Sequence, residues 1–258
     1  MNNKYNVEEI YKELNKSYIE LEISHKKFIQ IFGPVKFPLL IDENRKSVFN
    51  WYVFNVSPEH FDFHQLLDYL KLNGGNRNYN SILTYGDFAN SDNPLVRVHS
   101  CCFTGDIMHS TRCDCGQQLK KSLQLIVNNG SGAIAYLSNH EGRSIGLYAK
   151  AITHQIQDVF KLDTYESCNI INFKDEGRTF EDLEVIFNHL RGGKGITLLS
   201  NNPEKINSLV KNGVKISQIH PLDGFENEDN INYLNKKKMR AEKFEFYYEQ
   251  KNIKGKVL

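Results

Sequence analysis

Three cysteines lie within fourteen residues near the middle of this 258-residue chain. Ten residues separate Cys102 from Cys113, and a single residue separates Cys113 from Cys115. Thiolates bind Zn²⁺ strongly, and an ion held by three protein ligands keeps a fourth tetrahedral position open for water. That open position lowers the pKa of the bound water to about 7, so that hydroxide forms at neutral pH. The cluster therefore predicts a catalytic zinc centre that activates water for attack on an electron-poor carbon.

Two other interpretations of the cluster stay open at the level of sequence. A structural zinc site is usually closed by four protein ligands, and either His99 or His109 would supply the fourth. Alternatively, the thiols are unligated residues of the core, where free cysteine is common. The remaining cysteines are expected to pack: Cys101 points to the opposite strand face from its neighbour, and Cys168 is an ordinary buried thiol.

The elements that must position these cysteines alternate between strands and helices. Apolar runs predict strands over residues 81–85, 95–99, 133–137 and 196–199. Helical periodicity predicts helices from about 117 to 129 and over 144–158, 179–190 and 203–212. This alternation is typical of an α/β (α+β) fold in which helices flank a mixed sheet.

The first 80 residues are predicted to form an N-terminal extension. Apolar residues recur at helical spacing from residue 5 to about 31, which favours one amphipathic helix. A β-like stretch with a turn at 42–44 follows, and then a second helix over 64–72. We expect residues 81–235 to be the catalytic domain and residues 236–258 to be a helical tail.

Composition and charge narrow the class of protein. The chain is 40% hydrophobic and 24% charged, as soluble globular domains are. Its net charge of +1 gives no electrostatic footprint for nucleic acid, and no apolar run approaches the ~20 residues that cross a bilayer. The first residues are polar and acidic, unlike a signal peptide. We therefore expect a cytoplasmic protein that has no nucleic-acid or membrane partner.

Four short motifs occur around and beyond the cysteines. The first is His99-Ser100-x-Cys102-x-Thr104-Gly105-Asp106 with Arg112-Cys113-Asp114-Cys115-Gly116-x-Gln118-Leu119. The others are Glu141-Gly142-Arg143-x-Ile145-Gly146-Leu147, then Asp163-Thr164-x-Glu166, then Leu198-Leu199-Ser200-Asn201-Asn202-Pro203 with Lys205. In this order and spacing they resemble the GTP cyclohydrolase II family, over residues 84 to about 234.

The resemblance implies a reaction and its cofactors. That family opens the imidazole ring of GTP, releases formate and diphosphate, and leaves the diaminopyrimidinone ribosyl phosphate of riboflavin biosynthesis. The implied cofactors are Zn²⁺ at Cys102, Cys113 and Cys115, and Mg²⁺ with the nucleotide phosphates. The implied partners are GTP and a second copy of the chain in a homodimer.

The resemblance also implies roles for individual residues. The implied catalytic pair is Glu176, which accepts a proton, and Arg178, which attacks or stabilises the α-phosphate. The implied nucleotide contacts come from Arg97, His99, Gln118, Glu141, Gly142, Arg143, Thr164, Ser200 and Lys205. By chemistry alone, the Glu141 carboxylate suits a guanine N1–H and amino group, and arginine forks suit phosphate oxygens.

The sequence departs from the family pattern around the presumed pocket. His154 stands where the family has a tyrosine that assists ring opening, and a histidine can move protons near neutral pH. Glu176 replaces an aspartate, His140 a glutamine and Cys101 an acidic residue. Three hypotheses follow: the complete reaction on GTP, a diverged enzyme that stops at the formamide or uses another nucleotide, and a non-catalytic nucleotide-binding protein with structural zinc.

Overall fold

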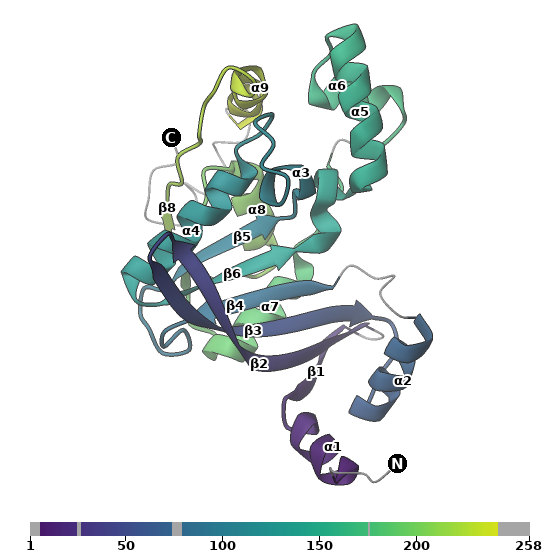
Figure 1. The fold of residues 1–258 in the computed structure, drawn as a ribbon, viewed down its shortest axis with the longest axis vertical. Coiled ribbons are helices and arrows are strands. Elements are labelled where there is room, and N and C mark those ends of the chain that lie inside the picture. Colours follow the sequence, from purple (N-terminus) through teal and green to yellow (C-terminus); the bar gives the residue numbers. More distant parts are fainter. Residues whose placement is uncertain (1–5, 25–26, 74–78, 175, 242–258) are drawn as a thin grey trace.

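One mixed sheet of eight strands organises the part of the chain that the structure, a computed structural model, describes: residues 6–24, 27–73, 79–174 and 176–241. The strand order is β1-β2-β3-β4-β6-β5-β7-β8 (Figure 1). The strands are β1 Tyr18–Ser24, β2 Lys27–Asp42, β3 Arg45–Ser57, β4 Asn80–Tyr85, β5 Leu95–Ser100, β6 Gly132–Leu137, β7 Ile196–Leu199 and β8 Ile216–His220. Neighbours from β1 to β6 pair antiparallel, whereas β6, β5, β7 and β8 run parallel. The predicted mixed sheet is confirmed.

Helices cover both faces of this sheet, as predicted. They are α1 Val7–Asn15, α2 Phe63–Asn73, α3 Phe103–Asp106, α4 Cys115–Asn129, α5 Gly146–Phe160, α6 Thr164–Ile170, α7 Glu181–Arg191, α8 Pro203–Lys211 and α9 Ile231–Ala241, with a 3₁₀ segment η1 at Ser138–Ser144. Apolar residues of α7 and α8 pack on one face, and those of α4 pack on the other. The α5–α6 pair stands away from the sheet (Figure 1). Residues of both helices line one pocket with the three cysteines. No described helix is long and apolar enough to cross a membrane.

Alternation along β5 decides which polar groups face the cysteines. Val96 and Val98 enter the core beneath α7 and α8, while Leu95 joins the core under α4. Because successive strand residues point to opposite faces, Arg97 and His99 point with Leu95 toward α4. Both are buried. The strand therefore carries two cationic or titratable side chains into the protein on the α4 side.

The four parallel strands all end at one edge of the sheet. Cys102 follows the end of β5, Glu141 follows β6, and Ser200 follows β7. Ligand sites in open α/β sheets form outside the carboxyl ends of the strands. The fold thus gathers the sequence motifs at the edge where a binding site is expected.

The predicted N-terminal helix is wrong beyond Asn15. Residues 18–24 and 27–42 form two antiparallel strands, β1 and β2. Alternate residues of β1, Ile19, Leu21 and Ile23, pack against the core, so a period of two prevails over the helical spacing. The strands predicted after residue 36 and the helix predicted over 64–72 are present as β2, β3 and α2.

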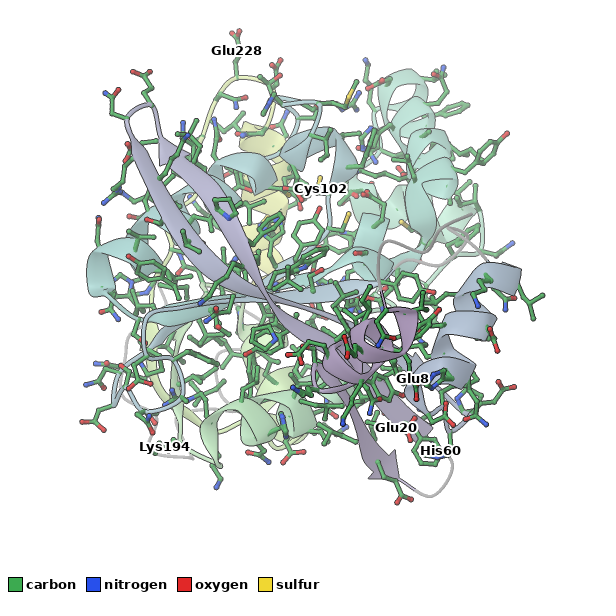
Figure 2. The ribbon with its side chains drawn as sticks, turned by 60° about the horizontal axis from the view of Figure 1, so that its bottom comes forward. Glu8, Glu20, His60, Cys102, Lys194 and Glu228 are labelled. Carbon is green, nitrogen blue, oxygen red and sulfur yellow. The ribbon has the colours of Figure 1, made fainter. Side chains whose placement is uncertain are left out.

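Polar contacts of Glu20 hold the first strands in place. Glu20 of β1 accepts hydrogen bonds from Gln30 Nε2 and Phe61 N, both at 2.9 Å, and contacts His60 Nδ1 (Figure 2). Since β3 pairs with β4, the first 80 residues extend the sheet of the expected catalytic domain. The divisions at residues 80 and 235 stay a prediction, and residues 242–258 of the predicted tail lie outside the described residues.

Candidate metal centre and active site

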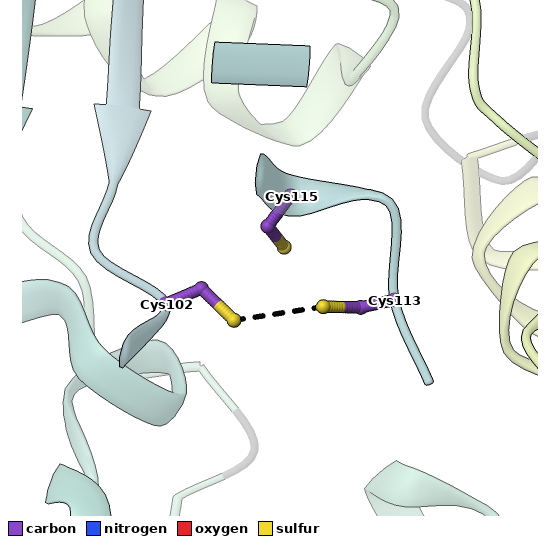
Figure 3. Close-up of side chains that lie close together, drawn as sticks. All are labelled: Cys102, Cys113 and Cys115. Carbon is purple, nitrogen blue, oxygen red and sulfur yellow. Dashed lines mark hydrogen bonds between the residues drawn. The ribbon is translucent and has the colours of Figure 1, made fainter. Parts of the chain in front are cut away.

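The three cysteines converge between the end of β5 and the start of α4 (Figure 3). The Sγ atoms of Cys102 and Cys113 are 3.6 Å apart, and all three sulfurs lie within 4.8 Å of one another. Sulfurs at about 2.3 Å from a tetrahedral zinc ion stand about 3.8 Å from each other. The donor set and its spacing therefore fit Zn²⁺.

Two glycines make this close approach possible. A Cβ on Gly105 would lie 2.8 Å from Cys113 Sγ and 3.3 Å from Cys102 Sγ. A Cβ on Gly116 would lie 2.2 Å from the carbonyl oxygen of Gly105. Real side chains do not fit at such distances, so the backbones of α3 and α4 can meet only with glycine at both positions.

A buried carboxylate fixes the backbone next to Cys102. Asp106 Oδ2 accepts hydrogen bonds from the Cys102 backbone N–H and the Tyr136 hydroxyl, and it contacts His99 Nε2, each at 3.0 Å. The Nε2 atom of His99 is therefore occupied by its contact with Asp106. Among the described residues, the group that could hold a metal comprises the three cysteines without His99 or His109. A structural zinc site would need a fourth protein ligand, and this group of described residues does not contain one.

Two adjoining pockets open at this edge of the sheet. The first, which we call the metal pocket, measures about 620 Å³ and is lined by the three cysteines, Gly142, Arg143, His154, Thr164 and Arg178 among others. The second, which we call the sheet-edge pocket, measures about 420 Å³ and is lined by Arg97, His99, Gln118, Ser200 and Lys205 among others. Ser100, Cys115, Arg178 and Tyr233 line both pockets. Besides Cys102 and Cys113, eleven of the predicted site residues line the two pockets. Two of these eleven, Cys115 and Arg178, line both pockets.

Glu141 and Glu176 line neither pocket. Glu141 Oε1 accepts from Lys150 Nζ at 2.7 Å, and its Oε2 accepts from Phe103 N at 2.5 Å and from Cys101 Sγ at 3.4 Å. Both oxygens are thus engaged within the protein. The following residues, Gly142 and Arg143, have φ of 58° and 61°, and this left-handed turn is a conformation that costs energy outside glycine. It directs Arg143 toward α6.

Arg143 and Arg178, two of the arginines that line the metal pocket, are held by polar neighbours. Arg143 Nη2 donates to Thr164 Oγ1 at 3.0 Å, and its guanidinium lies 4.5 Å from the ring centroid of Tyr165. Arg178 Nε donates to Glu176 Oε1 at 2.8 Å. Burial works to raise the pKa of Glu176, but the Arg178 guanidinium outweighs burial and holds that pKa below its usual value. Glu176 is therefore an ionised carboxylate at neutral pH.

The sheet-edge pocket has buried cationic groups at its base. Arg97 donates to the Leu199 carbonyl at 2.9 Å and to Gln118 Oε1 at 2.6 Å. Lys205 Nζ donates to the Val98 carbonyl at 2.7 Å. Burial and the nearby arginines Arg97 and Arg178 hold the pKa of Lys205 well below its usual value. An anionic ligand would relieve the repulsion between these groups.

Proton-handling groups in the metal pocket include His154, on α5. Burial, followed by the positive charges of Arg112 and Lys150, lowers the pKa of His154 below its ordinary value. The imidazole is therefore neutral at pH 7. Lys150 and Tyr233 are among the pocket residues that sequence reasoning missed. The spacing of Lys150 four residues before His154 on a predicted helix was an available signal, whereas nothing in the sequence placed Tyr233 here.

Comparison with known proteins adds a family context to this geometry. The sequence model of GTP cyclohydrolase II matches residues 60–221. GTP cyclohydrolase-2 of Haemophilus influenzae strain Rd is 41% identical over 156 residues, which are 60% of this chain and 71% of the relative. The enzyme of that name from Vibrio parahaemolyticus is 42% identical over 57% of this chain and 72% of its own. That from Saccharophagus degradans is 40% identical over 61% and 77%.

Adding one methyl group at Gly105 is expected to disrupt the cysteine cluster. In Gly105→Ala, the new Cβ would collide with Cys113 Sγ, and we expect zinc affinity to fall at least about 10-fold, the order seen when the support of a metal site is lost. Chelator competition measures this. The control is Gly192→Ala, whose Cβ would meet no atom within 4 Å although its φ is 58°. Equal zinc affinity in both variants would contradict the prediction.

Acid is expected to destabilise the protein through His140. Its Nε2 donates to the Thr179 carbonyl at 3.0 Å, which leaves Nδ1 to accept from the Ser100 hydroxyl. Burial, with Lys205 and Arg178, lowers the pKa of His140 from 6.5 to about 3. Below pH 6.5 the unfolded chain gains a proton that the folded chain takes up only near pH 3, so the free energy of unfolding decreases as the pH falls.

The measurement is urea unfolding at pH 7 and pH 5. From pH 7 to pH 5 the wild type should lose about 2 kcal/mol more than His140→Gln, which has no titrating group at this position. Equal losses in the two proteins would show that His140 is not the group responsible.

Proposed function

Because this chain belongs to the GTP cyclohydrolase II family, and is thus a hydrolase acting on GTP, we propose that it opens the GTP imidazole ring at a zinc centre. Formate and diphosphate leave, and the diaminopyrimidinone ribosyl phosphate of riboflavin synthesis remains. The observation that carries this proposal is the metal pocket itself, in which three thiols with zinc spacing share one cavity with a titratable imidazole and three arginines.

Zinc bound at Cys102, Cys113 and Cys115 would supply Lewis-acid activation of the water that attacks C8. The chain's own residues then have to hold the nucleotide and move protons. Arg143 and Arg178 offer forked donors to phosphate oxygens that also bind Mg²⁺. Thr164, Ser200 and Gln118 offer neutral hydrogen-bonding groups along the two pockets.

His154 is the proton carrier in this proposal. A neutral imidazole accepts a proton from the attacking water and returns it to the ring nitrogen that leaves when the C8–N bond breaks. At the phosphate end, Glu176 keeps the Arg178 guanidinium in one orientation through two N–H···O contacts. The carboxylate is then placed to accept a proton if Arg178 attacks the α-phosphate.

A second candidate function is supported by His154 itself. An imidazole is shorter than a phenol and differs in the direction of its polar atom, so the reaction would stop at the formamide or the pocket would take another nucleotide. The non-catalytic alternative needs a fourth zinc ligand, and His99 is already bonded to Asp106. We further propose, on the family alone, that the enzyme is a cytoplasmic homodimer.

Product analysis tests the proposal. Zinc-loaded protein is incubated with GTP and Mg²⁺, and formate, diphosphate and nucleotide products are quantified by mass spectrometry. We expect formate and diphosphate in equal amounts for the wild type. For His154→Ala we expect turnover to fall by about 10²–10⁴-fold, the usual contribution of a proton carrier, with little change in nucleotide affinity.

The other outcomes separate the alternatives. A formamide product without free formate would establish the early-stopping enzyme. Absence of GTP turnover by protein that retains zinc would redirect the search to other nucleotides. Loss of affinity at unchanged turnover in His154→Ala would remove the proton-carrying role.

A further inference from the structure

We propose that Lys150 is a positioning residue of the metal centre, which ties the ligand Cys102 to Glu141. Glu141 in turn holds the ammonium group of Lys150 beside the cysteines. This inference rests on the zinc centre of the proposed function, but its test measures metal binding without any nucleotide.

Lys150 Nζ has three partners that use its three N–H donors. It donates to Cys102 Sγ at 3.2 Å, to Thr104 Oγ1 at 2.9 Å and to Glu141 Oε1 at 2.7 Å. The side chains of Lys150 and Glu141 are only 12% and 10% exposed. An ion pair this far removed from water is costly unless each charge is well satisfied, and here both are. Lys150 is therefore fixed in place beside the cysteines.

Both carboxylate oxygens of Glu141 accept hydrogen bonds from within the protein. Lys150 occupies one oxygen, and Phe103 N and Cys101 Sγ occupy the other. Glu141 lines neither pocket, whereas Lys150, Cys101 and Cys102 all line the metal pocket. Lys150 therefore stands at the wall of the metal pocket, and the carboxylate that holds it lies outside the pocket lining.

Electrostatics explains why a cation is needed at this point. Three thiolates around one Zn²⁺ leave a net negative charge in a half-buried site. A charged N–H donor on a thiolate sulfur offsets part of that charge and holds the sulfur in one orientation, as outer-shell partners of metal ligands do. Glu141 in turn keeps the ammonium from turning toward the solvent.

The same lysine fixes the helix that carries His154. Lys150 and His154 are four residues apart in α5, which places them on one face. α5 stands away from the sheet (Figure 1), so the contacts of Lys150 with Thr104 of α3 and Glu141 of η1 anchor α5 to the metal centre. Metal ligation and the position of the imidazole are thereby coupled through one side chain.

The test compares zinc affinities by chelator competition in nucleotide-free protein. Lys150→Met removes the N–H···S bond, and we expect about 10–100-fold weaker zinc binding, the usual cost of losing an outer-shell partner. Lys161→Met is the matched control, because Lys161 lines the same pocket and none of its described hydrogen bonds reaches a cysteine. It should bind zinc as the wild type does.

A double variant keeps the test decisive if Lys150→Met folds poorly. Lys150→Met/Glu141→Gln also removes the buried carboxylate that the single variant leaves unpaired. We expect wild-type thermal stability to be largely recovered while zinc binding stays about 10-fold or more weaker. With Co²⁺ in place of zinc, the thiolate-to-metal charge-transfer band should shift to longer wavelength in both variants, because the sulfur has lost a hydrogen bond.

Three outcomes would overturn the proposal, and a fourth separates it from the proposed function. Wild-type zinc affinity in Lys150→Met, or recovery of affinity in the double variant, would show that the lysine merely neutralises Glu141. A wild type that fails to bind zinc would remove both this inference and the zinc chemistry of the proposed function. Failure of GTP turnover together with the expected affinities would remove only the proposed function.

Discussion

Three thiol sulfurs crowded within 4.8 Å impose the constraint on which the rest of this structure depends. Thiolates at that distance repel one another unless positive charge is supplied. Cys115 is the first residue of α4, where the backbone N–H groups favour a thiolate, and Lys150 donates to Cys102. Zinc would supply the remainder. Gly105 is then required because the space beside the sulfurs has no room for a side chain.

The sheet satisfies this constraint through its parallel half. β5 and β6 end side by side, so Cys102 after one strand and Glu141 after the next come within reach of a single lysine. Asp106 holds the backbone of Cys102 from the opposite side. The same alternation that points Val98 into the core points His99 toward Asp106. Core packing and the geometry of the metal centre are therefore consequences of one strand register.

The sequence predicted the parts of the site that depend on short-range spacing. The proximity of the three cysteines and the strands β4 to β7 were recognisable because local chemistry decides them. β1 was not, since its apolar residues satisfy helical spacing as well as alternation, and only pairing with β2 decides between the two. The orientation of Glu141 was equally hidden. Which partners a buried carboxylate meets is set by the packing of α5 on η1, and no local pattern encodes that contact.

If the family tyrosine implied by the resemblance corresponds to His154, the proposed role of the imidazole has a chemical consequence that follows from pKa values. A phenol, with an ordinary pKa near 10, carries its proton throughout the neutral range and donates it directly. The pKa of His154 is lowered by burial and by Arg112 and Lys150, so its imidazole must first accept a proton before it can donate one. In the proposed reaction, the water activated at the metal centre would supply that proton. The attack by water and the departure of the ring nitrogen would then depend on the same side chain. The position that Lys150 gives to α5 would govern both steps.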